Sequence, residues 1–159
     1  MNLFDVRPEH LYKVHVRSAD VAVSPSTNSS KITINLPAQM YNNDKHKRMY
    51  VVLDFFKLLS PNSINDGVFL RSSMASNQGY SSFNGTPNIL YYIPPADNGN
   101  STASGKAFQY VNQSFTNGIV VPHINQFDLF LTDKNGNAIS AANLANGWEC
   151  QLIVVYLHN

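Results

Sequence analysis

Short segments in which apolar and polar residues alternate recur along this chain, and each is bounded by Asn, Ser, Gly or Pro. The clearest is the segment 31–36, KITINL, in which every second residue is apolar and which Pro37 follows. Successive side chains of a β-strand point to opposite faces, so this alternation predicts a strand with one buried face. No segment of the sequence has the hydrophobic period of a long amphipathic helix. The pattern predicts an all-β protein.

Eight segments of this kind predict eight strands of one antiparallel β-sandwich. They are Leu11–Val23, Lys31–Leu36, Lys47–Leu59, Gly67–Arg71, Asn88–Ile93, Lys106–Val111, Ile124–Asp133 and Trp148–His158. The connections 24–30, 72–87 and 94–105 are rich in turn-forming residues, and we interpret them as loops, with disorder as the alternative for 94–105. The segment 138–147 has room for one short helical turn. A chain of 159 residues is the size of a single domain, which we expect to span 1–159.

The chain carries few charges. Charged residues are 13% of the sequence, about half the share of an ordinary soluble domain, and the net charge is only +1. This balance argues against a nucleic-acid-binding protein, which needs many cations to neutralise phosphates. A hydrophobic fraction of 43% with 11% aromatic residues argues against disorder. We therefore expect a folded domain whose surface includes weakly charged patches of the size of a protein interface.

Two predicted strands are apolar on both faces. Strict alternation assigns Met49, Val51, Leu53 and Phe55 to one face of 49–59, and Tyr50, Val52, Phe56 and Leu58 to the other. The second half of 148–157 is likewise apolar all round. A sandwich strand buries one face, so a second apolar face must be covered either by the protein's own loops or by another subunit.

Several stretches resemble the single jelly-roll penton and minor capsid proteins of large eukaryotic DNA viruses and of their virophage and polinton-like relatives. The N-terminal stretches are VHVRSAD at 14–20, KITINLPAQMYN at 31–42 and KRMYVVLDFFKLLSPNSIN at 47–65. The C-terminal ones are FDLFLTDKNGNAIS at 127–140 and WECQLIVVYLHN at 148–159. Together they cover roughly half of the chain.

The resemblance implies a jelly roll, whose eight strands B to I form the two sheets BIDG and CHEF. The predicted strand 47–59 would be D and the last strand would be I, and these two lie side by side in that topology. The two doubly apolar strands would then form one patch. We hypothesise that this outer face contacts a neighbouring subunit through Tyr50, Val52, Phe56, Ile153 and Val155.

The function that the resemblance implies is a structural role in a DNA-virus particle, as the penton or a minor capsid component. Its partners would be further copies of itself, five in a penton, together with the major capsid protein and other capsid subunits. We expect a virion protein made in the host cytoplasm, because the N-terminus lacks the apolar core of a signal peptide and no apolar run is long enough to cross a membrane. The first twenty residues have zero net charge, which argues against direct contact with the genome. Residues 1–10 are either an arm that reaches a neighbour or a frayed end.

A carbohydrate- or receptor-binding β-sandwich, such as a lectin-like or fibre-head domain, is the alternative function. Its candidate ligand-binding residues are Tyr80, Phe83, Tyr91 and Tyr92, whose rings could stack on sugars beside abundant Asn side chains. Aromatic residues near strand ends are more often part of the core.

Enzyme and metal-site motifs are absent from the sequence, so we expect no catalytic residue, no metal and no cofactor. The five histidines are scattered singly, without the spacing of metal ligands. The single cysteine, Cys150, shares a predicted strand face with Trp148 and Leu152, which favours a small buried hydrophobic residue over a nucleophile. Asp97–Asn100 and Asp133–Asn137 resemble fragments of calcium loops, but turn chemistry explains both.

Overall fold

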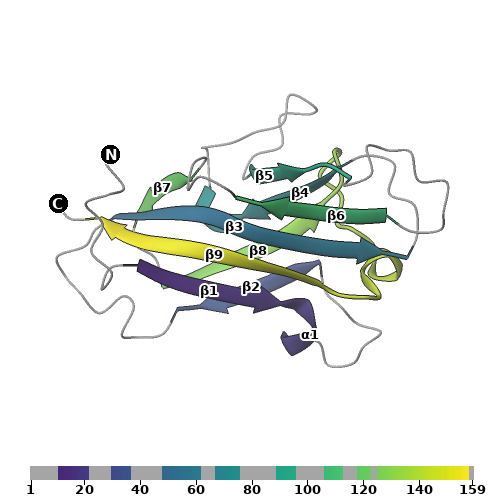
Figure 1. Ribbon diagram of the computed structural model, residues 1–159, viewed down its shortest axis with the longest axis horizontal. Helices are drawn as coiled ribbons and strands as arrows, with labels where there is room; N and C mark the ends of the chain where they lie inside the picture. Colours follow the sequence, from purple (N-terminus) through teal and green to yellow (C-terminus); the bar gives the residue numbers. More distant parts are fainter. Residues whose placement is uncertain are drawn as a thin grey trace.

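The computed structural model describes residues 11–21, 30–36, 48–61, 67–75, 89–95, 106–112, 118–122 and 125–157. Within these ranges the chain forms two antiparallel sheets, stacked as a sandwich (Figure 1). The first sheet has the order β1-β9-β3-β6, and β7 also pairs with β3. Its strands are β1 (Leu11–Arg17), β3 (Arg48–Ser60), β6 (Lys106–Val111), β7 (Ile119–Pro122) and β9 (Trp148–Leu157). The second has the order β2-β8-β4-β5, formed by β2 (Lys31–Asn35), β4 (Val68–Ser72), β5 (Ile89–Ile93) and β8 (Gln126–Thr132).

This strand order is that of a jelly roll. Lettered B to I along the chain, with β6 and β7 together at the position of G, the strands give a BIDG sheet and a CHEF sheet. Strands D and I, which are β3 and β9, pair along ten residue positions from Arg48 to Leu58. The fold class and the adjacency of the two doubly apolar strands are therefore confirmed.

The short helical elements lie at the ends of strands. The first predicted strand extends to Val23, but β1 ends at Arg17 and the single-turn helix α1 (Ser18–Val21) follows it. The 3-10 helix η4 (Ser73–Ala75) follows β4, and η5 (Ala141–Leu144) is the helical turn expected between 138 and 147. The Ser140 side chain accepts the Asn143 N–H at 3.4 Å and so caps η5. None of the helices in the described ranges is long and apolar enough to cross a membrane.

The hydrophobic core lies between the two sheets and follows the alternation of the strands. In β2, Ile32 is buried while Lys31, Thr33 and Asn35 are exposed, as the sequence predicts. The largest fully buried side chains of the core include Phe56, Phe108, Met49, Leu53, Leu58, Leu70, Ile93, Leu129, Leu131, Leu144 and Leu152. Both sheets contribute to this set, so neither could keep its inner face dry without the other.

A β-bulge in β3 changes which side chains face the core. The register with β9 runs Leu53 to Leu152 and then Phe55 to Gln151, which leaves Asp54 as the extra residue. One extra residue reverses the alternation, so Phe56 and Leu58 point into the core beyond it. The assignment of Phe56 to the outer face is therefore wrong: this ring is fully buried and stacks on Trp148, with centroids 6.1 Å apart.

Hydrogen bonds hold the bulge from three directions. The Asn112 N–H donates to the Asp54 carbonyl at 2.9 Å, and the Gln151 side-chain amide donates to the Asp54 carboxylate at 2.6 Å. From the opposite sheet, the Tyr91 hydroxyl accepts the Leu53 N–H at 3.2 Å. A bulge interrupts the hydrogen bonds between neighbouring strands, so its backbone groups need other partners. Here Gln151 of β9, Tyr91 of the opposite sheet and Asn112, directly after β6, supply hydrogen bonds to the bulge.

Candidate functional site

The outer face of the BIDG sheet holds four of the five residues of the hypothesised subunit interface. Tyr50 pairs with Val155 and Val52 pairs with Ile153, so their side chains form one apolar cluster outside the sandwich core. Val52, Ile153 and Val155 are nevertheless only 1–2% exposed in the single chain. The first of the two alternatives, burial of this face within the single chain, is therefore correct for these three residues. They leave almost no side-chain surface that a neighbouring subunit could contact.

Tyr50 shows how closely part of this face is packed. Its hydroxyl accepts the Gly118 N–H at 3.1 Å, and its ring lies so near that a Cβ at Gly118 would sit 2.3 Å from Cζ. Gly118 directly precedes β7, which continues the sheet beside Tyr50. Tyr50 thus contacts the start of β7 closely, and a side chain at 118 would have to displace its ring.

Exposed apolar side chains lie toward one edge of the same outer face. Leu59 in β3 is 50% exposed, Val111 at the end of β6 is 57% exposed and Val120 in β7 is 40% exposed. Val111 pairs with the half-buried Phe55, and Val120 pairs with Tyr50. We call Leu59, Val111 and Val120 together the β3–β6–β7 patch; its members are spread along the sheet, at the register of residues 59, 55 and 50 of β3. These exposed apolar side chains therefore lie beside the buried cluster of Tyr50, Val52, Ile153 and Val155 that the sequence predicted as the interface.

Of the four residues of the carbohydrate-binding alternative, the two that the structure describes point to opposite faces of the CHEF sheet. Tyr91 points into the core, where burial raises the pKa of its hydroxyl to about 12. Tyr92 is on the opposite face of the CHEF sheet, 51% exposed, with its ring across Gly67 and 5.0 Å from that of Phe69. Tyr80 and Phe83 lie outside the described residues. Of the two described tyrosines, Tyr92 is the one that a ligand could reach.

The Asp133 side chain makes a turn and so confirms the turn predicted at 133–137. Its Oδ1 accepts the backbone N–H groups of Asn135 and Asn137 at 2.8 and 2.9 Å, and Gly136 adopts φ 84°. Asp97–Asn100 lies outside the described residues. No group of three or more His, Cys, Asp or Glu side chains able to hold a metal ion occurs in the described part of the chain.

Cys150 is fully buried on the core face of β9, as the sequence predicts. Burial, with a smaller effect of the Glu149 charge, raises the pKa of its thiol to about 12 from 9.0. The thiolate is the nucleophile, so a thiol held neutral and covered is inert in the folded protein.

We expect stability to fall as pH rises from about 9 to about 12. The pKa values of Cys150, Tyr91 and Tyr156 are all raised to about 12 by burial, so the unfolded chain loses these protons first. Their contribution is fully present below the unfolded pKa and is lost as pH approaches the folded one. Urea unfolding across this range measures the loss. Cys150→Ala should flatten the curve most between pH 9 and 10, where the thiol of the unfolded chain titrates ahead of the tyrosines, and an unchanged slope would contradict the assignment.

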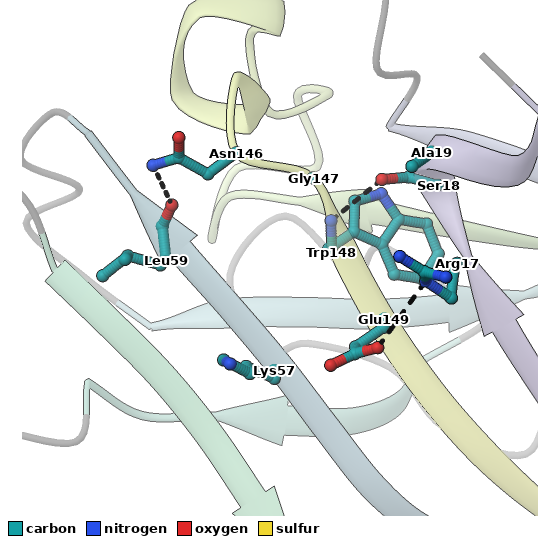
Figure 2. Close-up of a pocket in the computed structure, with 9 residues that line it drawn as sticks. All are labelled: Arg17, Ser18, Ala19, Lys57, Leu59, Asn146, Gly147, Trp148 and Glu149. Atoms are coloured by element: carbon teal, nitrogen blue, oxygen red, sulfur yellow. Dashed lines mark hydrogen bonds and ion pairs between the residues drawn. The ribbon is translucent and has the colours of Figure 1, made fainter. Parts of the chain in front are cut away.

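A pocket of about 230 Å³ opens where β1 ends, β3 ends and β9 begins (Figure 2). Its lining is Arg17, Ser18, Ala19, Lys57, Leu59, Asn146, Gly147, Trp148 and Glu149. Two hydrogen bonds between distant parts of the sequence shape its walls. The backbone N–H of Trp148 donates to the Ser18 hydroxyl at 2.9 Å, and the side-chain amide of Asn146 donates to the backbone carbonyl of Leu59 at 3.2 Å. The pocket is therefore formed by the fold before any ligand arrives.

The charges of the pocket lie in a row across three strands. Glu149 pairs in register with Arg17 of β1 on one side and with Lys57 of β3 on the other. The Glu149 carboxylate lies 4.0 Å from the Arg17 guanidinium and 3.5 Å from the His15 ring, while Arg17 lies 3.9 Å from Asp20. These separations exceed normal hydrogen-bond lengths, so the pairing is weak. Sequence reasoning missed this pocket, because its residues come from 17–19, 57–59 and 146–149.

Comparison with known proteins finds similarity at the level of the structure only. No protein-family model matches the sequence, and no curated protein matches it. Among solved structures, a cryo-EM structure of Mud crab tombus-like virus aligns with 94% of this chain and 82% of that chain, at 9% sequence identity and a TM-score of 0.26. The fold assignment rests on the strand order and register described above.

Proposed function

We propose that this protein is a structural component of a DNA-virus particle, a penton or minor capsid protein that works by assembly. The observation that carries the proposal is the location of the capsid-like sequence stretches. They fall on β1, β2, β3, β8 and β9, which are strands B, C, D, H and I of the jelly roll. The resemblance therefore coincides with the strands that the proposed family's fold requires.

The surface chemistry supports association by apolar contact more than by charge. The β3–β6–β7 patch exposes three large hydrophobic side chains on one face, where β3 also carries two exposed cations, Arg48 and Lys57. Protein interfaces concentrate apolar area at their centre and deplete charged residues there. We infer that a neighbouring capsid subunit covers this patch, which replaces Val52, Ile153 and Val155 as the proposed contact.

Imaging of the purified protein by negative-stain electron microscopy tests the proposal. Closed rings, with five copies in a penton, are the expected result, since a heterologous contact that closes on itself gives cyclic symmetry. A homogeneous monomer that also fails to bind the capsid subunits encoded with it would contradict the proposal.

Val111→Lys should abolish the assembly without unfolding the protein. Val111 is more than half exposed in the single chain, so lysine can extend into water there, whereas at an interface its charge would be desolvated. We expect a change of about 1 kcal/mol or less in unfolding free energy and a shift to monomer in sedimentation velocity. Tyr92→Lys is the matched control, at a similarly exposed position on the other sheet. If both variants assembled like the parent, the patch would not be the contact.

A further inference from the structure

We propose that the pocket between β1, β3 and β9 binds a carboxylate carried on a short apolar stem. This inference is argued from the pocket's size, the Lys57 ammonium and the exposed Leu59 side chain rather than from the proposed role in assembly. A subunit that covered Leu59 would compete with the ligand for that side chain. The chemical class of ligand is an acidic side chain of a partner protein or a small branched carboxylic acid, which share the same recognition.

The size of the pocket selects a small group. Pockets for drug-sized ligands and cofactors typically enclose about 300–1,000 Å³, whereas this one encloses about 230 Å³. A single side chain or an acid of similar bulk matches that space. The two hydrogen bonds from Trp148 to Ser18 and from Asn146 to Leu59 hold the walls in place, so little ordering remains to be done on binding.

The charges of the lining favour an anion. Of the lining side chains, Arg17 and Lys57 are positive and Glu149 is negative, but Arg17 is already paired with Asp20 and Glu149 at 3.9 and 4.0 Å. Lys57 is exposed, and among the described residues its ammonium makes no ion pair or hydrogen bond. Lys57 is therefore the cation to which a carboxylate can bind, and Arg17 adds N–H donors that its two carboxylate neighbours do not hold at hydrogen-bond length.

Leu59 supplies the apolar part of the site. Its side chain is 50% exposed and lies on the outer face of β3, two residues beyond Lys57 (Figure 2). A ligand whose carboxylate reaches Lys57 and Arg17 can therefore lay an alkyl stem against Leu59 and remove that apolar surface from water. Glu149 sits in register between the two cations, so its negative charge limits the affinity for any anion and disfavours a second carboxylate further.

An NMR titration tests the site with two probes and a neutral control. Isocaproate, acetyl-leucyl-glutamate amide and the uncharged isocaproamide are each added to the labelled protein, and the amide signals of Gly147 and Glu149 are followed. We expect saturable shifts with at least one acid and none with isocaproamide. Lys57→Gln should weaken binding roughly three- to tenfold, and Lys13→Gln, which removes the same charge from the same sheet face outside the pocket, should not.

The arms of the titration separate the two sources of the carboxylate. Tighter binding of the peptide supports an acidic side chain of a partner protein, and tighter binding of isocaproate supports a small acid. The inference is overturned if neither acid shifts these signals, if isocaproamide shifts them equally, or if Lys57→Gln binds as the parent does.

Discussion

Deleting Asp54 should leave a folded jelly roll, although a deletion inside a paired strand usually shifts its register. Asp54 is the extra residue of the bulge, so its removal joins Leu53 directly to Phe55 and gives β3 unbroken pairing with β9. Every other side chain keeps its face. The losses are the hydrogen bonds that Asp54 makes with Asn112 and Gln151, for which we expect a decrease of about 1–3 kcal/mol in unfolding free energy. Circular dichroism, dispersion of the amide NMR signals and urea unfolding measure this.

Deletion of Val52 is the matched control, two residues away in the same strand. The bulge can absorb this deletion only by turning Leu53 outward and Asp54 into the core, and without that adjustment one half of β3 reverses its faces. Forcing the larger Leu53 side chain into the covered position of Val52 while burying the Asp54 carboxylate in the core should remove stability comparable to the roughly 5–15 kcal/mol of a whole domain. We expect that variant to be unfolded or aggregated. If deletion of Asp54 had the same effect, the bulge would be indispensable to the fold.

The sheet order could be predicted from the sequence because the resemblance assigned strands D and I, and periodicity independently singled out the same two segments as apolar on both faces. The faces within β3 could not be predicted. A run such as Leu53-Asp54-Phe55-Phe56 alternates acceptably with or without an extra residue, and the partners that fix the bulge, Tyr91, Asn112 and Gln151, are distant in sequence. The strand β7 was missed because its four residues are too few to show a period.

The candidate site was only partly predictable for a related reason. Apolar alternation identifies which side chains lie on the outer face, but not whether the chain covers them. Val52, Ile153, Val111 and Val120 are all β-branched apolar residues of the outer face, and the sequence does not distinguish them. Val52 and Ile153 are nevertheless buried, whereas Val111 and Val120 are exposed. Burial outside a sandwich core depends on where connecting segments run, which short-range pattern does not encode. The pocket depends further on two hydrogen bonds across 87 and 130 residues.

Substituting alanine for each of the adjacent residues Phe55 and Phe56 should give effects that differ several-fold. Phe56 is fully buried and stacked on Trp148, so we expect Phe56→Ala to lower the free energy of unfolding by about 3–5 kcal/mol. Phe55 lies half-buried on the outer face beside Val111, and its loss should be about 1 kcal/mol. Strict alternation without a bulge gives the opposite order, because it puts Phe55 inside and Phe56 outside. Equilibrium unfolding in urea distinguishes the bulged from the unbulged arrangement of β3. A larger effect at Phe55 would mean that the register shift at Asp54 is absent.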